Sequence, residues 1–389
     1  MARYEFIAPC HFGLESVLKK EINDLGLEIT AVEDGKVCFA GDESTFAIAN
    51  IFIRTAERVI WKIGSFSAVT FDELFCNVKD LPWEDILPPD GKFWVTKATS
   101  VKSALFSTSD IQSIVKKAIV DRLREKFGIA WFPETGNSYP IRVNIIKDVV
   151  TIGIDTSGDS LHKRGYRKLS GKAPLSETLA AALIMLTPWR ADRYLVDPFC
   201  GSGTIPIEAA MIGMNIAPGA KRNFTCESWK ERVPEKYFKY ARQRAEAEIK
   251  RDVELHIQGY DIDNEVIKVA RQNAMVAGVG EKIHFQQREV ARLSHPKDYG
   301  FIITNPPYGE RLEEKAALPA LYKEIGHAFA GLPTWSEYVI TSYEDACKYI
   351  GKKADKNRKI YNGMIKTYYY QFMGPRQPRA PRDGERTEK

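Results

Sequence analysis

Residues 301–312 have the sequence FIITNPPYGERL, in which four apolar or β-branched residues run directly into Asn-Pro-Pro-Tyr. Proline cannot donate to a sheet ladder, so Pro306 and Pro307 end the strand and leave their carbonyl oxygens free to accept hydrogen bonds. The Asn305 side-chain oxygen and the Pro306 carbonyl can both accept from one exocyclic amine and aim its lone pair at an electrophile. Tyr308 provides a ring on which a flat base can stack. The tetrad therefore predicts transfer of a group to a planar aromatic amine, although a proline pair is also an ordinary strand stop.

A glycine-containing turn, DPFCGSGTIPIEAA at residues 197–210, follows an earlier apolar strand. Gly201 and Gly203 permit positive φ and a close approach of the backbone to a ligand, and a helix that opens near Thr204 points its N–H groups at that ligand. The turn lacks the third glycine of a dinucleotide site and the Gly-Lys-Ser/Thr ending of a phosphate-binding loop. Because Asp197 at the strand end would repel a phosphate, we expect a ligand that carries an amine and a sulfonium.

Two further acids end the next two predicted strands. Asp261, in GYDID, is placed to accept hydrogen bonds from both hydroxyls of a ribose, and the alternative is that it caps the following helix. It lies 60 residues after Gly201 (261 − 201), whereas the acid of a Rossmann site follows its glycines by about 20 residues. An insertion at about residues 215–253 accounts for the difference. Glu289, at the end of the third strand, is positioned to accept from an adenine amino group.

The elements that position these residues alternate between strands and helices. The apolar strand segments of the C-terminal half lie at residues 194–199, 256–263, 282–289, 301–307, 338–343, 358–361 and 365–372. Helical spacing between most of them predicts an α/β fold with a doubly wound, mostly parallel sheet. Asn362-Gly363 between the last two predicts an antiparallel C-terminal hairpin. Residues 1–158 also alternate but end in a hairpin of strands, which predicts a smaller α+β region.

Length and composition exclude several classes of protein. A chain of 389 residues is expected to form two or three domains, and 44% hydrophobic and 28% charged residues are typical of a globular protein. No run of about 18 apolar residues and no signal-peptide pattern occurs, so we expect a cytoplasmic protein without membrane contact. Six scattered cysteines and six histidines, without a C-x-x-C pair or a ligand pattern, predict reduced thiols and no metal site.

The basic residues are clustered. The net charge of +5 slightly favours the binding of polyanions. Residues 162–172 are more strongly basic, because they hold five Lys or Arg and no acid. Residues 218–224 and the tail at 375–386 are also basic, and the Pro- and Arg-rich tail is expected to be disordered. Each stretch alone is as well explained by solvated surface. The candidates for phosphate contacts are Lys163, Arg164, Arg167 and Lys221.

These motifs together resemble a known family. Residues 172–373 are similar to class I S-adenosylmethionine-dependent methyltransferases of the Asn-Pro-Pro-Tyr, amino-methylating group. With the linker SLHKRGYRKLSGKAPLSETLAAALI at residues 160–184, nearly the whole chain resembles the THUMP-domain RNA guanine-N2 methyltransferases, above all the family that modifies large-subunit (23S) ribosomal RNA. The resemblance implies a ferredoxin-like domain at 1–60, a THUMP RNA-binding domain at 61–160, a class I methyltransferase domain at 161–374, and a basic tail at 375–389.

The resemblance also assigns roles to residues. It places catalysis at Asn305, Pro306, Pro307 and Tyr308. It places S-adenosylmethionine at Ala173, Pro174, Leu175, Asp197, Phe199, Cys200, Gly201, Ser202, Gly203, Thr204, Asp261, Ile262, Glu289 and Asn305. The family usually has Asp where this chain has Glu289, whose side chain is longer by one methylene.

The expected reaction is methyl transfer from S-adenosylmethionine to the exocyclic N2 amine of a guanine in RNA, with 23S ribosomal RNA favoured. Transfer RNA is an alternative substrate, because related THUMP methylases act on it. Adenine-N6 methylation of DNA and glutamine methylation of proteins use the same site geometry, and an RNA-binding N-terminal half argues against both. A non-catalytic ribosome-assembly factor is a further alternative, against which the complete set Asp197, Asp261 and Asn305 argues. The oligomeric state stays open.

Overall fold

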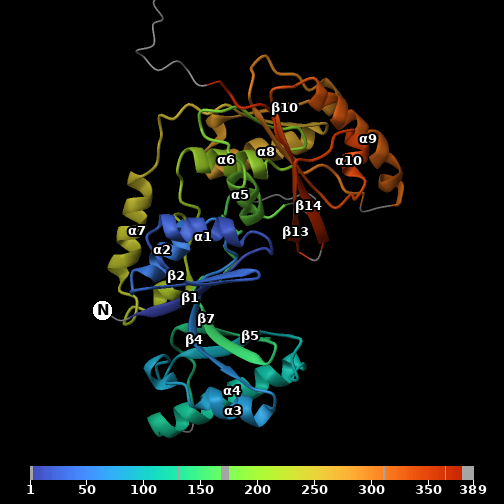
Figure 1. Cartoon of the computed structure of the whole chain (residues 1–389). Helices are drawn as coiled ribbons and strands as arrows, with labels where there is room; N and C mark the ends of the chain where they lie inside the picture. The colour runs from blue at the N-terminus through green and yellow to red at the C-terminus, as the bar shows by residue number, and fades with distance from the viewer. Residues whose placement is uncertain (1–2, 130, 168–174, 310–311, 364, 379–389) are drawn as a thin grey trace, which may run out of the picture. The chain divides into compact units, whose positions relative to one another are not determined.

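A computed structural model of the chain describes residues 3–129, 131–167, 175–309, 312–363 and 365–378 (Figure 1). The chain forms two compact units: Met1–Gly165 with Ile216–Ile249, and Tyr166–Asn215 with Lys250–Lys389. The sequence therefore passes between the units three times, after Gly165, Asn215 and Ile249. None of the helices in the described part of the chain is long and apolar enough to span a membrane. The basic tail lies outside the described residues from 379 onward.

The N-terminal unit is built on one seven-stranded sheet. In sheet order its strands are β2 (Glu28–Glu33), β3 (Lys36–Gly41), β1 (Tyr4–Pro9), β4 (Ile60–Ser67), β7 (Val149–Asp155), β6 (Ser138–Ile146) and β5 (Lys92–Val101). β5 and β6 pair in parallel, and the other neighbours pair antiparallel. β1 pairs with β4, and Glu5 lies opposite Lys62. Strands from the first 60 residues and strands from residues 60–155 therefore form one continuous sheet.

Four helices pack on this sheet. They are α1 (Glu15–Asp24), α2 (Thr45–Phe52), α3 (Phe71–Lys79) and α4 (Thr108–Phe127). α3 begins with a capping box in which Thr70 accepts from the Glu73 N–H and the Glu73 carboxylate accepts from the Thr70 N–H, and this arrangement satisfies two N–H groups of its first turn. α4 buries Ile111, Val115 and Ile119, spaced one turn apart, and so packs one face inward. Figure 1 shows α1 and α2 near β1 and β2, and α3 beside α4.

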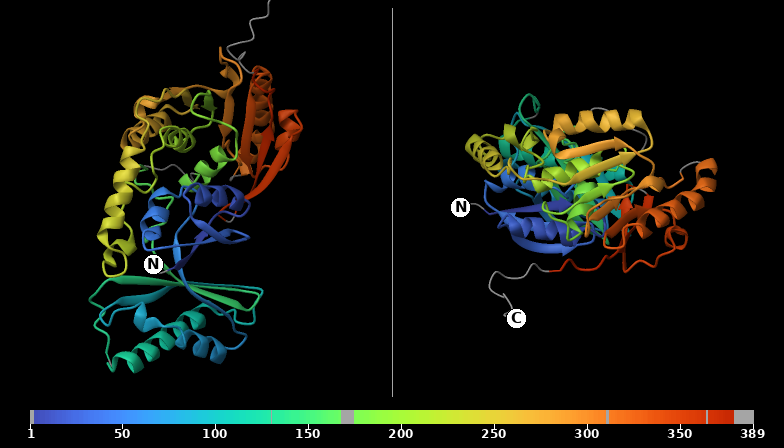
Figure 2. Two further views of the ribbon diagram at one scale, coloured as in Figure 1. Left: turned by 60° about the vertical axis from the view of Figure 1, so that its left-hand side comes forward. Right: turned by 90° about the horizontal axis from the view of Figure 1, so that it is seen from above.

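The insertion belongs to the N-terminal unit, although strands of the C-terminal sheet precede and follow it in sequence. It contains a 3-10 turn, Thr225–Ser228, and helix α7 (Glu235–Ala247). Trp229 is buried, stacks on Tyr139 with ring centroids 5.0 Å apart, and donates from Nε1 to the Ser138 carbonyl at 2.9 Å. α7 contacts α2, as the yellow helix in Figure 2 shows. The insertion thus completes the core of the N-terminal unit.

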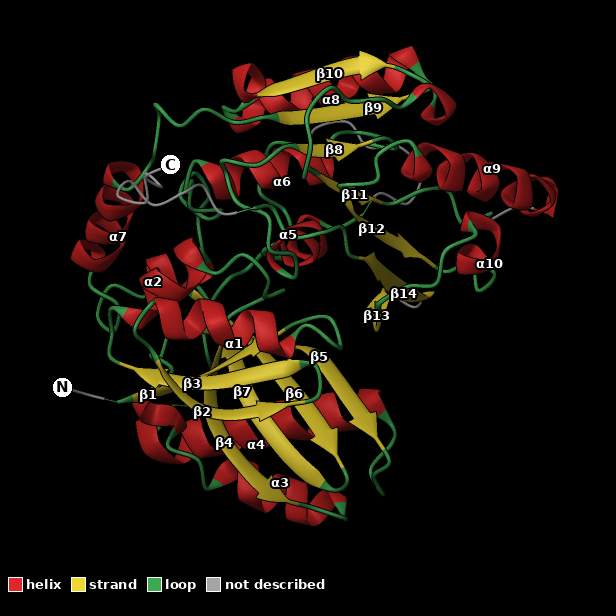
Figure 3. Cartoon of the chain, turned by 45° about the horizontal axis from the view of Figure 1, so that its top comes forward, coloured by secondary structure: helices red, strands yellow, loops and turns green. Residues whose placement is uncertain are grey.

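The C-terminal unit contains a second seven-stranded sheet (Figure 3). In sheet order its strands are β10 (Ile283–Gln287), β9 (Ile257–Asp261), β8 (Leu195–Asp197), β11 (Phe301–Thr304), β12 (Ser336–Thr341), β14 (Ile365–Phe372) and β13 (Lys356–Asn362). The first five are parallel, and β14 runs antiparallel to both of its neighbours. The predicted fold class is confirmed, including the C-terminal hairpin.

Helices cover the two faces of this sheet. They are α5 (Glu177–Met185), α6 (Thr204–Gly213), α8 (Asn264–Ala277), α9 (Leu312–Ala330) and α10 (Ala346–Ile350). Figure 1 shows α5, α6 and α8 on one side of the sheet and α9 with α10 on the other. All four residues of β11 are buried, as expected of a parallel strand covered on both faces. Strand order reverses between β8 and β11, so ligands are expected beyond the carboxyl ends of these strands.

Candidate active site

The turn after β8 has the geometry of a ligand-binding loop. Gly201 has φ of +52° and Gly203 has φ of +87°, in the left-handed region that favours glycine. A Cβ on Gly203 would lie 3.1 Å from both Ala270 and Phe285, whereas a Cβ on Gly201 would meet no atom within 4 Å. Gly203 therefore serves close packing, and Gly201 faces open space. The N–H groups of the first turn of α6, which starts at Thr204, complete this loop.

Asp261 ends β9 and is tied to the glycine turn. Its carboxylate accepts from the Gly201 N–H at 3.0 Å and from the Asp263 N–H at 3.1 Å. The cap of the following helix is instead Asp263, the next acid in the sequence, which accepts from the Glu265 N–H at 2.8 Å. The alternative in which Asp261 caps the helix is therefore wrong. Asp261 is half-buried, and each carboxylate oxygen keeps a lone pair for a further donor. The neighbouring Ile262 side chain is exposed.

Asp197, at the end of β8, points into the protein. Only 1% of it is exposed, and its Oδ1 accepts from Thr304 Oγ1 at 2.7 Å and from the Phe199 N–H at 3.1 Å. Burial raises the pKa of Asp197 to about 7, against the opposing effect of these two hydrogen bonds. This orientation differs from the expectation that the acid faces a ligand cation. Asp197 instead joins the glycine turn to the last residue of β11.

The tetrad after β11 lies at the same edge of the sheet. Asn305 and Tyr308 are half-buried, Pro306 is buried and Pro307 is exposed. The Tyr308 hydroxyl donates to Asn305 Oδ1. The buried Tyr322 of α9 donates weakly to the Pro307 carbonyl, at 3.4 Å, and shares a 2.6 Å hydrogen bond with Thr341 Oγ1. β11, β12 and α9 thus all contribute to the position of the tetrad.

Glu289 lies outside the sheet, two residues beyond the end of β10. Its side chain is 53% exposed and pairs with Arg292 at 3.7 Å. The preceding Arg288 donates its N–H to the Asp261 carbonyl at 2.9 Å, which keeps this segment beside the end of β9. Gln287 donates to the Ile262 carbonyl at 2.9 Å. The backbone of the Glu289 segment therefore lies beside Asp261. The carboxylate of Glu289 pairs with the exposed Arg292.

Within the described part of the linker, Arg167 connects two segments of the C-terminal unit. Ala173 and Pro174 lie outside the described residues, and Leu175 is buried. Arg167 donates to the Leu175 carbonyl at 2.7 Å and to Thr204 Oγ1 at 2.8 Å, and it pairs with Glu177 at 3.5 Å. It therefore ties the segment after 174 to the first residue of α6.

The four candidate phosphate contacts fall into two groups. Arg164 is 6% exposed and donates to the Leu161 and Arg54 carbonyls, and Arg167 is held internally as described above. Burial of Arg164 argues against a phosphate contact by that residue, and the 13% exposed side chain of Arg167 is already engaged by Leu175, Thr204 and Glu177. Lys163 is 60% exposed, with an ion pair to Asp159 at 3.1 Å, and Lys221 is exposed.

Two residues of the site carried no clear pattern in the sequence. Thr304 is a single hydroxyl at the end of an apolar strand, and only its hydrogen bond to Asp197, 107 residues away, shows its role. Tyr322 has the spacing of an ordinary core residue in α9, four residues after the buried Leu318. Among the described residues, no group of three or more His, Cys, Asp or Glu is arranged to hold a metal ion.

The strand order, the glycine turn after β8 and the Asn-Pro-Pro-Tyr tetrad after β11 define a class I methyltransferase domain. Comparison with known families agrees with this class. Residues 164–371 match the family described as RMKL-like, methyltransferase domain. Residues 5–60 match the RlmL ferredoxin-like domain, and residues 68–155 match the THUMP domain. The chain therefore belongs to the RMKL-like methyltransferase family, in the branch with ferredoxin-like and THUMP domains.

Individual relatives are similar over nearly the whole chain. It is 47% identical over 97% of its length to the Bacillus subtilis protein named "Putative RNA methyltransferase YpsC", of which 98% is covered. It is 33% identical over 95% of its length to the ribosomal RNA large subunit methyltransferase K/L of Cellvibrio japonicus. The chain spans 51% of that K/L protein. The crystal structure described as "SMU.472, a putative methyltransferase complexed with SAH" has a TM-score of 0.91 and 42% identity, with 97% of this chain and 100% of that one covered.

Proposed function

We propose that this protein transfers a methyl group from S-adenosylmethionine to the exocyclic N2 amine of a guanine in RNA, with large-subunit ribosomal RNA as the substrate. The observation that carries the proposal is the Asn-Pro-Pro-Tyr tetrad at the end of β11, joined through Thr304 and Asp197 to the glycine turn. The THUMP domain and the relatives named for RNA and ribosomal RNA support the choice of RNA.

The residues at the ends of β8 and β9 fit S-adenosylmethionine. The space open to Gly201 allows a ligand to approach the backbone, and the carboxylate of Asp261 is placed for ribose hydroxyls. The exposed Ile262 offers an apolar surface for the adenine ring. We keep Leu175, Phe199, Cys200, Ser202 and Thr204 as further contacts, and Glu289 as the adenine contact that the structure supports least. When bound, S-adenosylmethionine supplies a methyl group that its sulfonium makes electrophilic. The similar protein SMU.472, whose structure is a complex with SAH, supports S-adenosylmethionine as the ligand.

The amine side of the site prepares the nucleophile. Asn305 Oδ1 and the Pro306 carbonyl accept the two N–H bonds of the guanine N2 amine, which turns its lone pair toward the methyl carbon. The base displaces the Tyr308 hydroxyl from Asn305 Oδ1, because both compete for the same acceptor. Bound S-adenosylmethionine would supply the methyl carbon to this lone pair and leave as S-adenosylhomocysteine, and the cationic product would lose its proton to water. No strong base is required.

The target guanine must be unpaired or flipped, because a base inside a duplex cannot reach the tetrad. Residues 61–160, the linker and the insertion would together hold the flanking RNA, with the exposed Lys163 of the linker and Lys221 of the insertion on phosphates. Such contacts supply affinity with little sequence information. Methylation of ribosomal RNA, transfer RNA, DNA adenine or protein glutamine gives a different product in each case, and an assembly factor gives none. Identification of the methylated product therefore distinguishes these functions.

The test is mass-spectrometric mapping of methylated nucleosides in cells with and without the gene, and in cells that carry the Asn305→Ala variant. We expect one N2-methylguanosine in large-subunit ribosomal RNA to disappear in the deletion and in the variant, and to return with the parent protein. Loss of N2-methylguanosine from transfer RNA would assign the alternative substrate. Loss of N6-methyladenine from DNA would overturn the proposal, and unchanged methylation of all three would favour an assembly factor.

A further inference from the structure

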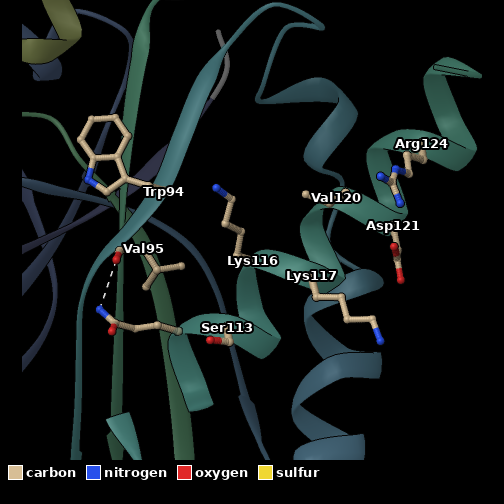
Figure 4. A pocket seen from close by; sticks show the side chains of 9 residues that line it. Trp94, Val95, Ser113, Lys116, Lys117, Val120, Asp121 and Arg124 are labelled. Carbon is tan, nitrogen blue, oxygen red and sulfur yellow. Dashed lines mark hydrogen bonds between the residues drawn. The ribbon is translucent and has the colours of Figure 1, made fainter. Parts of the chain in front are cut away.

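Polar side chains of this protein find their partners in two ways. The groove between β5 and α4 in the N-terminal unit presents exposed cations, which solvent can hydrate; Lys116, Lys117 and Arg124 are among them (Figure 4). In the C-terminal unit, by contrast, Tyr322 and Thr341 carry hydroxyls on side chains that are 0% exposed. Buried hydroxyls of this kind are expected to bond within the protein. Where their protons point is therefore a property of the fold.

These two hydroxyls belong to a chain of hydrogen bonds that ends at the tetrad. The Tyr343 N–H donates to Thr341 Oγ1 at 3.0 Å. Thr341 Oγ1 and Tyr322 Oη lie 2.6 Å apart, and Tyr322 Oη lies 3.4 Å from the Pro307 carbonyl oxygen. A carbonyl can only accept, and each hydroxyl has one proton. The directions are therefore fixed: Thr341 donates to Tyr322, and Tyr322 donates to Pro307.

The Tyr322 hydroxyl keeps its proton for this bond. Burial raises the pKa of Tyr322 above its ordinary value, so the hydroxyl is a donor throughout the neutral range. The bond to Pro307 is long, but the donor is itself polarised by the short bond from Thr341, and successive bonds in a chain strengthen one another.

Helix α9 holds the segment after Pro307 at a second point. Gly309 has φ of +74°, and a Cβ there would lie 2.9 Å from Leu318 Cδ1 and 3.1 Å from Lys315 Cα. Leu318 and Tyr322 are four residues apart, so they lie on one face of α9, and both are buried. The main chain on either side of Tyr308 is therefore fixed against this helix.

The two proline carbonyls of the tetrad consequently differ. That of Pro307 is occupied by Tyr322, whereas that of Pro306 accepts from no residue in the described part of the chain. Neighbouring Cα atoms are about 3.8 Å apart, so an amine that bonded to the wrong carbonyl would be displaced by far more than the ~1 Å that can cost 100-fold in rate.

We propose that Tyr322 and Thr341 are positioning residues, which occupy the Pro307 carbonyl so that the amine of the substrate base is received by Asn305 and Pro306. This inference rests on the proposed function. It explains how two adjacent prolines, both with bare carbonyls, offer only one of them to the substrate. Because Tyr322 and Thr341 act through the main chain of the tetrad, they affect the rate of the chemical step and leave the affinity for S-adenosylmethionine unchanged.

The first test is single-turnover methyl transfer by the full chain, with ribosomal RNA from cells that lack the gene as the substrate. We expect Tyr322→Phe, which keeps the ring and removes the hydroxyl, to lower the rate about tenfold. S-adenosylmethionine affinity, measured by calorimetry, should stay parental. Thr341→Val should also lower the rate, and Thr341→Ser should restore it because the hydroxyl returns. Tyr322→Phe combined with Thr341→Val should be no slower than Tyr322→Phe alone, because the two hydroxyls act as one unit.

Tyr369→Phe is the matched control. Tyr369 is also 0% exposed, and its hydroxyl donates to a main-chain carbonyl, that of Leu183, at 3.0 Å. The control therefore loses a bond of the same kind in the same unit. It should lower the melting temperature about as much as Tyr322→Phe does and leave the rate of methyl transfer unchanged.

A second measurement needs no substrate. Pro307-Tyr308 is the only Pro-Tyr pair in the sequence. Protein that is isotope-labelled only at proline carbonyl carbons and tyrosine nitrogens therefore gives a single peak in a carbonyl–amide correlation spectrum. Loss of the hydrogen bond should move the Pro307 carbonyl resonance upfield in Tyr322→Phe, and Tyr369→Phe should leave it in place.

Three results would overturn the inference. A parental rate in Tyr322→Phe would reduce Tyr322 to a core residue like Tyr369. A carbonyl resonance that this substitution does not move would show that Tyr322 does not hold Pro307. Weaker S-adenosylmethionine binding at a parental single-turnover rate would assign the two hydroxyls to the cofactor side. If the parent protein does not methylate this RNA, the proposed function fails instead, and the carbonyl resonance still decides whether Tyr322 occupies Pro307.

Discussion

Two aspartates end neighbouring strands of the C-terminal sheet, Asp197 after β8 and Asp261 after β9, and their surroundings differ. Asp197 is 1% exposed and is bonded to the Thr304 hydroxyl, so it faces the strand that carries the tetrad. Asp261 is half-buried and is bonded to two main-chain N–H groups of adjoining turns. The same residue type at equivalent strand ends therefore serves two purposes. Under the proposed function, Asp197 would position the amine side of the site, and Asp261 would be accessible to the ligand on the cofactor side.

The largest effect is expected on the amine side, from Asn305→Ala. Loss of the amide removes an acceptor that orients the nucleophile, and misplacement of a reacting group costs on the order of 100-fold in rate. The measurement is single-turnover methyl transfer to RNA, with S-adenosylmethionine affinity by calorimetry as the control. The affinity should stay within about twofold of the parent, and turnover at the parental rate would refute the role of the amide.

On the cofactor side, Asp261→Ala should weaken S-adenosylmethionine binding roughly 10- to 150-fold, the loss of hydrogen bonds to a charged group of about 1.5–3 kcal/mol. Asp263→Asn is the matched control, since asparagine also caps a helix and Asp263 is two residues away. The control should bind the ligand like the parent. Equal affinities for the Asp261 variant and the parent, in calorimetry, would remove the ribose assignment.

Thr304→Val tests whether Asp197 positions the tetrad. The variant leaves a buried carboxylate without one of its two donors, at a cost of about 1–3 kcal/mol in the free energy of unfolding. We expect kcat to fall about tenfold with KM for S-adenosylmethionine little changed, because the geometry of Asn305 is disturbed and the ligand contacts are kept. Thr304→Ser should restore kcat. A change in KM alone would place Thr304 on the cofactor side instead.

Burial of Asp197 also predicts a pH dependence of stability. Its pKa is raised to about 7, from about 3.9 in an unfolded chain, so the native state binds more protons between these values. The stabilising contribution is full below pH 4 and is lost as the pH rises through 7. Urea unfolding from pH 5 to 8 should therefore show a decline in the parent that is shallower in Asp197→Asn. Burial raises the pKa of Glu337 to about 7 as well, so the variant should keep part of the decline, and an unchanged decline would contradict a neutral buried Asp197.

The smallest effect is expected for Glu289→Gln. The side chain is 53% exposed and pairs with Arg292 on the surface, where an ion pair is typically worth less than about 1 kcal/mol. S-adenosylmethionine affinity, measured by calorimetry, should change less than about threefold. A loss as large as that of the Asp261 variant would show that Glu289 contacts the adenine despite its longer side chain.

The sequence by itself determined the features that depend on neighbouring residues. Strand and helix alternation predicted the doubly wound sheet, Asn362-Gly363 predicted its antiparallel hairpin, and the proline pair at 306–307 predicted the end of β11, because each depends on local backbone preferences. The glycines at 201 and 203 were recognisable for the same reason, since their positive φ is a local property.

Tertiary structure alone decided which polar groups are accessible. It turned Asp197 inward onto Thr304 and gave the helix cap to Asp263 rather than Asp261. In a run that is basic in sequence, it buried Arg164 and bonded the half-buried Arg167 to Leu175 and Thr204. It also placed residues 216–249 in the N-terminal unit. These outcomes depend on contacts between segments distant in sequence, where the cost of burying a charge is set by the partners that packing supplies. Such partners are invisible to residue type and spacing.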